Sequence, residues 1–372
     1  MTENEQEKEL DITEDFLRVR APIPRDFSLH PFPNTRFQGS KSKIISWIYD
    51  KLNGLNFESA LDLFGGTGSV AHLFKTMGKK VSYNDSLKFN YTIGKALIEN
   101  PGIRLEREDI DYVLTKHKEI DYPTFIQDTF KDIFYLEEEN KWLDYVITNI
   151  RDVQNEYKQA MSFFALFQAC IMKRPYNLFH RANLYVRTSD VERGFGNKTT
   201  WDTPFEEHFI NVVLEANNAV FDNGKKCTSY NYLAEEFPEE LSYDLVYMDP
   251  PYVSAKGVGV DYLDFYHFLE GMVDYNIWAT RVLNKYKHLP LKGRGTNPWT
   301  KAKQNYQMFE KVFKKFKDST IVVSYRNDGT PTIEQLEELL SSYKEKVISH
   351  KISHKYALSK NGESHEVLLI GT

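Results

Sequence analysis

Cysteine is scarce in this chain of 372 residues, which contains only Cys170 and Cys227. Two thiols cannot build the disulfide framework of a small secreted domain, and no cluster of Cys and His has the spacing of a metal site. Long apolar runs are also missing, because none approaches the roughly 18 residues that a membrane span needs. The acidic N-terminus lacks the apolar region of a signal peptide. These absences predict a protein of the reducing cytoplasm, without a membrane segment and without a metal site.

Apolar and aromatic side chains are plentiful, at 41% and 14% of the residues, which suffices for one large domain or a core with insertions. The net charge of -6 is unevenly distributed. Residues 1–15 carry seven acids and one Lys, whereas residues 281–317 carry eleven Lys or Arg and a single acid, Glu310. The basic stretch 281–317 is therefore a candidate for binding phosphates, with a solvated lysine-rich helix face as the alternative.

The most informative stretch runs from Leu245 to Tyr252, where four apolar residues lead into Asp-Pro-Pro-Tyr. A short apolar run is typical of a buried parallel strand, and Pro250 and Pro251 would end it in a stiff turn. In open α/β sheets, ligands bind at the carboxyl ends of strands. The alternative is a tight turn that carries no chemistry.

This corner has the groups that an amino-bearing base requires. Asp249 and the Pro250 carbonyl can accept the two amino hydrogens, and the ring of Tyr252 can lie against the base. An exocyclic amine is a poor nucleophile because its lone pair is delocalised, and two acceptors favour a more tetrahedral nitrogen. The remaining requirement is an electrophilic methyl group, which predicts a second site for S-adenosylmethionine.

A glycine-rich turn predicts where a nucleoside cofactor would bind. The strand at 60–63 runs into Gly65-Gly66-Thr67-Gly68, where glycines allow a sharp turn and a close approach of ligand to backbone. The next strand leads to Asp85, 23 residues after Asp62, close to the spacing at which an acid meets ribose hydroxyls. The turn lacks the glycine spacing of a dinucleotide fingerprint and a phosphate-loop lysine. A turn that binds nothing is the alternative.

Two shorter signals accompany this turn. Phe37 and Lys41 flank Gly39-Ser40 at the start of a predicted helix, an arrangement that suits a ligand with an aromatic ring and a carboxylate. Ser40 as a simple helix cap is the alternative. Asn231 ends the predicted strand 226–231 and could place an amide near the base of the cofactor, although a turn-forming Asn fits equally well.

The region 105–217 lies between the glycine turn and Asp-Pro-Pro-Tyr. A buried helix is predicted over 156–172, and residues 173–187 are dense in basic, aromatic and amide side chains, the mixture that reads and stacks on bases. An aromatic core with exposed basic residues is the alternative. The candidate DNA contacts come from this region and, for the last two, from the basic stretch: Lys173, Arg174, Arg181, Asn183, Arg187, Lys198, Lys292 and Arg294.

In this order, the motifs Phe37-Gln38-Gly39-Ser40-Lys41, Asp62 to Gly68, Asp85 and Asp249 to Tyr252 resemble the alpha class of amino-directed DNA methyltransferases, mostly N6-adenine-specific. The resemblance covers the core, about half of the chain. It implies methyl transfer from S-adenosylmethionine to N6 of an adenine flipped out of double-stranded DNA, with a cognate restriction nuclease as a possible partner. Methylation of N4 of cytosine or of an RNA base, a nicotinamide-dependent oxidoreductase, and an inactive DNA-binding module are the alternatives.

The resemblance also assigns residues. The implied cofactor site consists of Phe37, Lys41, Asp62, Phe64, Gly65, Gly66, Gly68, Asp85 and Asn231, and the implied catalytic residues are Asp249, Pro250, Pro251 and Tyr252. Asn231 departs from the pattern, since an acid is expected near the adenine of the cofactor.

The fold implied is α/β, a methyltransferase-type Rossmann-like mixed sheet with a terminal antiparallel hairpin and an inserted target-recognition region. The hairpin is expected from strands at 346–352 and 366–370. The predicted organisation is an acidic leader and extended segment at 1–35, core segments at 36–104, 218–254 and 320–372, a target-recognition insert at 105–217 and a basic insert at 255–319.

Overall fold

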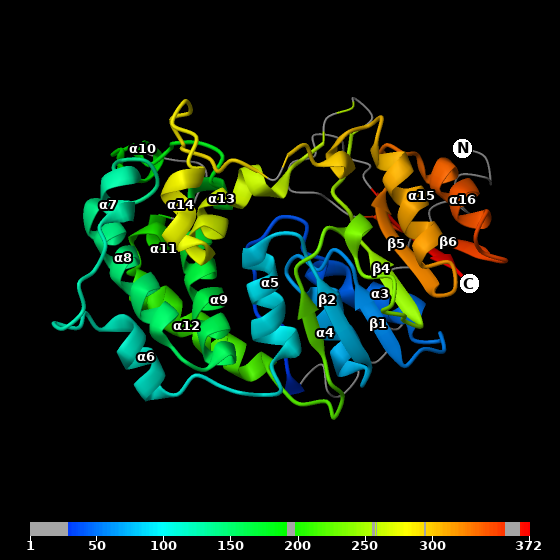
Figure 1. Cartoon of the computed structure of the whole chain (residues 1–372), viewed down its shortest axis with the longest axis horizontal. Helices are drawn as coiled ribbons and strands as arrows, with labels where there is room; N and C mark the ends of the chain where they lie inside the picture. The colour runs from blue at the N-terminus through cyan, green and yellow to red at the C-terminus, as the bar shows by residue number, and fades with distance from the viewer. Residues whose placement is uncertain (1–28, 192–197, 255–256, 258, 294, 354–364) are drawn as a thin grey trace, which may run out of the picture.

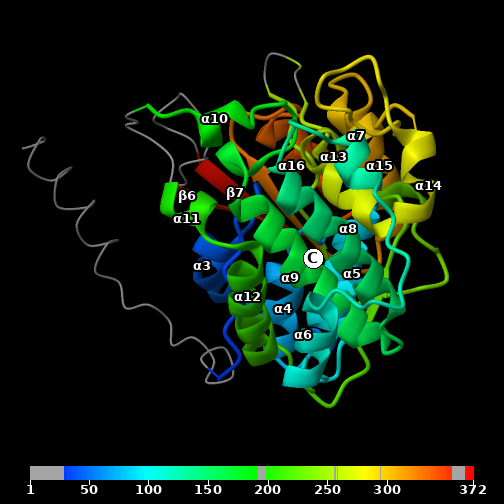
Figure 2. The same cartoon turned by 90° about the vertical axis from the view of Figure 1, so that its left-hand side faces the viewer.

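The computed structural model describes residues 29–191, 198–254, 257, 259–293, 295–353 and 365–372. Most of the predicted acidic leader lies outside the described residues. Figure 1 shows a helical unit on the left and a sheet on the right, with α5 (Lys88–Gly94) between them. Figure 2 views the molecule from the helical side.

Seven strands form one mixed sheet in the order β3-β2-β1-β4-β5-β7-β6. The strands are β1 (Ser59–Asp62), β2 (Lys80–Asn84), β3 (Thr228–Tyr230), β4 (Leu245–Met248), β5 (Thr320–Arg326), β6 (Val347–Ser353) and β7 (His365–Gly371). The first five are parallel, and β7 runs antiparallel to both β5 and β6. The predicted mixed sheet with a terminal antiparallel hairpin is confirmed.

The order of the strands explains where a site can form. From β1 the chain moves outward to β2 and β3, and it then crosses to β4 on the other side of β1. Asp62, the last residue of β1, is in register with Tyr247 of β4. The glycine turn after β1 and the Asp-Pro-Pro-Tyr corner after β4 therefore leave the sheet side by side. Reversals of strand order at the carboxyl edge are the usual ligand sites of open α/β sheets.

Each face of the sheet is covered by its own core. Strand residues alternate between the faces, so that Tyr247 joins one core while Val246 and Met248 join the other. The first face packs against α3 (Ile45–Leu52), α4 (Ser69–Thr76), α5 and the π-helix η2 (Lys95–Glu99), and the second against η4 (Ala234–Glu236), α15 (Asn305–Lys315) and α16 (Ile333–Ser341). The short 3-10 helices η1 (Ser42–Ile44) and η5 (Pro298–Thr300) precede α3 and α15.

The helical unit packs outside α5 and η2 and forms a further layer. Its members are α6 (Arg107–Leu114), α7 (Phe125–Thr129), α8 (Glu137–Asp152), α9 (Glu156–Met172), η3 (Pro175–Asn177), α10 (Tyr185–Thr188), α11 (Lys198–Asp202), α12 (Phe205–Ala219), α13 (Tyr262–Val273) and α14 (Tyr275–Arg281). The predicted helix 156–172 is α9, which begins where Asn155 accepts hydrogen bonds from the amides of Tyr157 and Lys158.

The predicted basic insert is divided between two parts of the molecule. Helices α13 and α14 belong to the helical unit, whereas α15 packs on the sheet, and the connecting chain passes from one part to the other (Figure 1). The segment boundaries expected from the sequence stay predictions. In the part of the chain that the structure describes, no helix has the length and apolar character to cross a bilayer.

Candidate active site

A pocket at the carboxyl ends of β1, β2 and β4 collects the separate motifs. Among its lining residues are the predicted Phe37, Lys41, Asp62, Phe64, Gly65, Gly66, Asp85, Asp249 and Pro251. The predicted Gly68, Asn231, Pro250 and Tyr252 adjoin the lining without belonging to it. Motifs that lie more than 200 residues apart in the chain thus share one pocket.

The glycine turn has its shape because it packs on Tyr83 of β2. A Cβ atom added at Gly65 would lie 2.0 Å from the Tyr83 ring. The Tyr83 hydroxyl donates a hydrogen bond of 2.7 Å to the Gly66 carbonyl, and Gly66 has a φ of 50°. Gly68, with a φ of 81°, is the left-handed residue that starts α4. At Gly65 and Gly66 the turn therefore presents backbone without side chains along the wall of the pocket.

Two carboxylates stand on this wall. Asp85 accepts hydrogen bonds from the amides of Gly66 (3.0 Å) and Leu87 (2.9 Å) and so ties the glycine turn to the end of β2. Asp62 accepts one bond of 3.1 Å from the Ala71 amide through Oδ2. Its buried Oδ1 has no hydrogen-bond partner among the described residues. Burial, with a contribution from Asp249, raises the pKa of Asp62 to about 8.

Asn231 stands beside this wall. Its amide donates a hydrogen bond of 2.8 Å to the main-chain carbonyl of Asp85 and joins the ends of β2 and β3. The following residues, Tyr232 and Leu233, line the pocket. Phe37 lines the pocket too, but its ring is stacked on Tyr266 at 4.0 Å between centroids.

The Asp-Pro-Pro-Tyr corner is joined to Lys41 by a buried polar network. Lys41 Nζ lies 2.7 Å from Asp249 Oδ2 and donates to Tyr252 Oη at 2.6 Å. Tyr252 Oη donates in turn to Asp249 Oδ1 at 2.7 Å. A third acid, Glu366 of β7, has Oε1 3.5 Å from Lys41 Nζ. Lys41 thus lines the pocket and is paired with the Asp-Pro-Pro-Tyr corner.

These contacts set the charge state of the network. Burial would lower the pKa of Lys41, but the charges of Asp249 and Glu366 outweigh it and raise that pKa above its ordinary value. Burial also raises the pKa of Asp249, and Lys41 opposes that rise. The ammonium of Lys41 is therefore the main group that favours the ionised form of Asp249, and the hydrogen bond from Tyr252 acts in the same direction.

Sequence reasoning missed several residues of this region, among them Glu366 and Trp299. Glu366 carried a signal, since it is an acid directly before the apolar run of a strand. Trp299, from the basic stretch, lines the pocket. Its Nε1 donates a hydrogen bond of 2.9 Å to Glu235, and its ring makes an edge contact with the ring of Phe64 at 4.9 Å between centroids. An aromatic residue among lysines and prolines gave no local sign of where it would lie.

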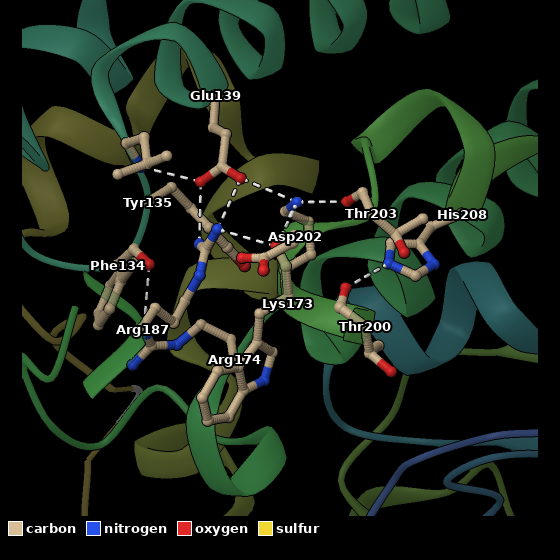
Figure 3. Close-up of polar contacts among 12 residues, drawn as sticks. Phe134, Tyr135, Glu139, Lys173, Arg174, Arg187, Thr200, Asp202, Thr203 and His208 are labelled. Atoms are coloured by element: carbon tan, nitrogen blue, oxygen red, sulfur yellow. Dashed lines mark hydrogen bonds and ion pairs between the residues drawn. The ribbon is translucent and has the colours of Figure 1, made fainter. Parts of the chain in front are cut away.

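Four of the predicted DNA contacts are corrected by the structure. Arg174 donates to the carbonyls of Phe134 (3.1 Å) and Leu178 (3.2 Å) and to Asn183. Figure 3 shows Lys173 and Arg187 converging on one acid, Glu139 of α8. The four residues are at most 8% exposed, and each already has a protein partner for at least one polar group: Lys173, Arg174, Asn183 and Arg187. They hold the helical unit together, and their burial excludes them from the surface that a DNA backbone could reach.

Glu139 is the centre of this interior cluster. It accepts two hydrogen bonds from Arg187, at 2.9 and 2.7 Å, and lies 2.9 Å from Lys173 Nζ. Burial would raise the pKa of Glu139, but the two cations outweigh it and lower that pKa. The carboxylate is thus held ionised between two buried cations, and it joins α8 to α9 and α10.

We expect Glu139→Ala to destabilise the protein by about 3–5 kcal/mol, because it leaves two buried cations without their acid. Denaturant unfolding measures the loss. Glu138→Ala is the matched control, since this neighbouring side chain is 83% exposed and pairs with Lys141 at the surface. Because the folded pKa of Glu139 is depressed, the stability it contributes should be present near neutral pH and be lost as the pH falls through that pKa. Equal stability of the two variants would contradict a structural role for Glu139.

The remaining predicted DNA contacts lie at the surface. Arg181, Lys198 and Lys292 are exposed, and Lys198 pairs with Asp202 at 2.9 Å. Arg294 lies outside the described residues. The basic stretch keeps further lysines exposed, namely Lys285, Lys287, Lys301, Lys303, Lys311, Lys314 and Lys317. Its residues Gly293 and Gly295 to Trp299 line the pocket, so the basic surface adjoins the site. The described residues include no cluster of three or more His, Cys, Asp or Glu arranged to hold a metal.

Comparisons with known proteins identify the family of this chain. A family model described as D12 class N6 adenine-specific DNA methyltransferase matches residues 37–353. The chain is 29% identical over 346 residues to the type II methyltransferase M2.HphI of Haemophilus parahaemolyticus, an alignment that covers 91% of this chain and 97% of that protein.

Two further relatives are longer than this chain. It is 25% identical over 363 residues to the modification methylase StsI of Streptococcus sanguinis and 26% identical over 370 residues to the type II methyltransferase M.FokI of Planomicrobium okeanokoites. Each alignment covers 90% of this chain, which spans about half of those two proteins, 51% and 52%. Because the family model spans most of the chain and contains the motifs from Phe37 to Tyr252, the chain belongs to the D12 class N6 adenine-specific DNA methyltransferases and is a DNA adenine N6-methyltransferase.

Proposed function

We propose that this enzyme methylates an adenine that has been flipped out of double-stranded DNA, with the Asp-Pro-Pro-Tyr corner holding the base. Inside the duplex the amino group is beyond the reach of a protein pocket, so the base must leave the stack. The observation that carries the proposal is that Asp249 and the glycine turn line the same pocket. A base held at Asp249 and a nucleoside held along the glycine turn would therefore meet.

S-adenosylmethionine is the donor that we propose for the other part of the pocket. The buried Asp62 Oδ1 has no partner among the described residues, and an ammonium group on a ligand would satisfy it. Asp85 lines the pocket and has lone pairs to accept from ribose hydroxyls. Gly65 and Gly66 leave the backbone open to close approach. These residues fit the donor, which supplies an electrophilic methyl group on a positively charged sulfur when bound.

The chain's own residues would then prepare the nitrogen. Asp249 and the Pro250 carbonyl each accept one amino hydrogen, which favours a more tetrahedral nitrogen and frees its lone pair. The two prolines fix the corner, and Tyr252 supplies the ring against which the base lies. Lys41 keeps Asp249 ionised and thus able to accept. Positioning and preorganised acceptors would account for most of the acceleration.

For binding of double-stranded DNA we propose the exposed basic side chains, led by Arg181, Lys198 and Lys292 together with Arg294. Their support is their exposure, apart from Arg294, and the excess of positive charge in the basic stretch beside the pocket. The type II methyltransferases among the relatives make a cognate restriction nuclease a reasonable partner to propose. The location in the cytoplasm stays a prediction.

We expect the double variant Lys292→Ala/Lys301→Ala to bind DNA more weakly and with less dependence on salt. These two exposed lysines precede and follow the pocket-lining residues Gly293 and Gly295 to Trp299. Each lost phosphate contact should reduce the slope of log K against log salt by about 0.9. Titration of DNA at several salt concentrations measures the slope. The control is Lys225→Ala/Lys226→Ala, an exposed pair just before β3 and therefore at the opposite edge of the sheet. Equal slopes in both double variants would remove the basic stretch from the DNA interface.

The experiment that tests the proposed function uses the protein, methyl-labelled S-adenosylmethionine and unmethylated duplex DNA. Digestion of the DNA should yield labelled N6-methyladenine as the modified nucleoside. Single-stranded DNA and RNA are run in parallel, and labelling in them without labelling of duplex DNA would overturn the proposed substrate. Mapping the labelled positions then provides a defined DNA for the kinetic tests below.

A further inference from the structure

Glu366 is a buried acid that the mechanism above does not use. It is the second residue of β7 and only 1% exposed, in a strand whose following residues are apolar. Its Oε1 accepts a hydrogen bond from the hydroxyl of Ser324 on β5, and Ser324 is itself fully buried. A buried carboxylate is costly unless it is paired. The cation that can pair with Glu366 is Lys41, whose Nζ lies 3.5 Å from Glu366 Oε1.

The acceptor that the reaction needs is already engaged. Asp249 Oδ2 holds Lys41 Nζ at 2.7 Å, and Asp249 Oδ1 holds the Tyr252 hydroxyl at 2.7 Å. An incoming amino hydrogen must compete with these two donors for Asp249. The competition is strongest with the ammonium, because in that pair both the donor and the acceptor are charged, whereas the Tyr252 hydroxyl is a neutral donor.

Glu366 offers both donors another acceptor close by. Its Oε1 lies 3.5 Å from Lys41 Nζ and 3.3 Å from Tyr252 Oη. A small movement would bring the Lys41 ammonium closer to Glu366 and leave it near Asp249, so the ammonium would stay paired with an acid throughout. The lining of the pocket does not include Glu366, so a base or cofactor would not displace it.

We propose that Glu366 is a positioning residue, which takes over the Lys41 ammonium and the Tyr252 hydroxyl when the amino group of the target base engages Asp249. This inference rests on the proposed function of Asp249. In the free enzyme, the Lys41 ammonium is shared between the two acids and closer to Asp249. In the complex with DNA it moves toward Glu366, and Asp249 turns one oxygen to the base.

Glu366→Gln tests the exchange because it keeps the size of the side chain and removes its charge. Lys41 then stays on Asp249, and the base is held less well. We expect kcat to fall roughly tenfold or more, since a misplacement of about 1 Å can cost on the order of 10²-fold. Binding of S-adenosylmethionine, measured by calorimetry, should be retained. A parallel loss of cofactor binding would mean general damage to the fold and would overturn this interpretation of a lowered kcat.

The pH dependence of kcat distinguishes positioning from a structural role. Asp249 faces Lys41, Tyr252 and Glu366 and lies near Asp62, Tyr247 and Tyr262. The charge of Glu366 raises the pKa of Asp249 and of Lys41 alike. Its removal lowers both, so the pH range of activity should move to lower pH in Glu366→Gln. An unchanged range in a variant that binds the cofactor would overturn the proposal.

Glu366→Asp decides the question should the amide variant fail to fold. It keeps the charge and draws it back by one methylene, so we expect a lower kcat with the pH range of the wild-type enzyme. A wild-type kcat in Glu366→Asp would overturn the exchange. Glu338→Gln, an exposed acid on α16, serves as the control for loss of one charge in the same part of the molecule. Asp249→Ala is assayed beside them. Activity of that variant would overturn the proposed function itself. If Asp249→Ala is inactive but Glu366→Gln has the kcat and pH range of the wild-type enzyme, only the inference about Glu366 is overturned.

Discussion

Replacing Asp249 with Ala will abolish methyl transfer to DNA and leave the protein folded. The variant loses the acceptor that holds one amino hydrogen of the base, and preorganised partners of this kind contribute on the order of 10²–10³ in kcat. The fold should survive because Lys41, the buried cation beside Asp249, keeps Tyr252 Oη at 2.6 Å and Glu366 at 3.5 Å. No buried charge is therefore left without a partner.

Transfer of labelled methyl groups to DNA measures the loss, and calorimetry with S-adenosylmethionine shows whether the pocket is intact. Asp244→Asn is the matched control, because Asp244 stands at the other end of the same strand β4. Its carboxylate accepts from the amides of Glu58 (2.9 Å) and Ser59 (2.8 Å), at the edge of the sheet opposite the corner. That variant should keep its kcat even where its stability falls. Near-normal transfer by Asp249→Ala would exclude Asp249 from the mechanism.

The elements that could be predicted are those whose signals are local. The apolar run before Asp249 predicted a buried strand, and β4 is fully buried at the centre of the sheet. The glycines after β1 predicted a turn without side chains, and Tyr83 supplies the packing that requires Gly65. Each of these features depends on a few consecutive residues, so the chain's own pattern is sufficient to reveal it.

The basic segment 173–187 shows what a local pattern cannot decide. Lys173 and Arg181 look alike in the sequence, yet Lys173 is 2% exposed and Arg181 is at the surface. The difference comes from Glu139, an acid more than 30 residues away whose position depends on the packing of α8 against α9. A run of basic residues has the same composition whether its side chains face phosphate groups or buried carbonyls.

The Asp-Pro-Pro-Tyr corner shows the same limit. The residues of the Asp-Pro-Pro-Tyr stretch were recognisable together, but the charges that tune Asp249 come from two remote segments. Lys41 lies before α3 and Glu366 lies on the last strand, and only the pairing of β7 beside β5 brings Glu366 to the corner. The resemblance implied a contact of Lys41 with the cofactor. In the structure this residue lines the pocket and is paired with Asp249 as well.

Lys41→Met will separate these two roles of Lys41. Burial raises the pKa of Asp249, and the Lys41 ammonium is the charge that lowers it. Without the ammonium the pKa of Asp249 rises further, so the carboxylate forms only at higher pH. Since the reaction needs ionised Asp249, we expect kcat to fall near neutral pH and to recover partly as the pH increases, with the acidic limb of the profile moved upward.

The measurement is kcat as a function of pH, together with the dissociation constant for S-adenosylmethionine. Lys43→Met is the control, because Lys43 is an exposed neighbour two residues along the chain and should change neither quantity. Were Lys41 chiefly a cofactor contact, Lys41→Met would weaken binding of S-adenosylmethionine and keep the pH range of the wild-type enzyme. An upward move of the acidic limb with little change in cofactor affinity would instead show that Lys41 acts through Asp249, since only the ionisation of that carboxylate couples the two.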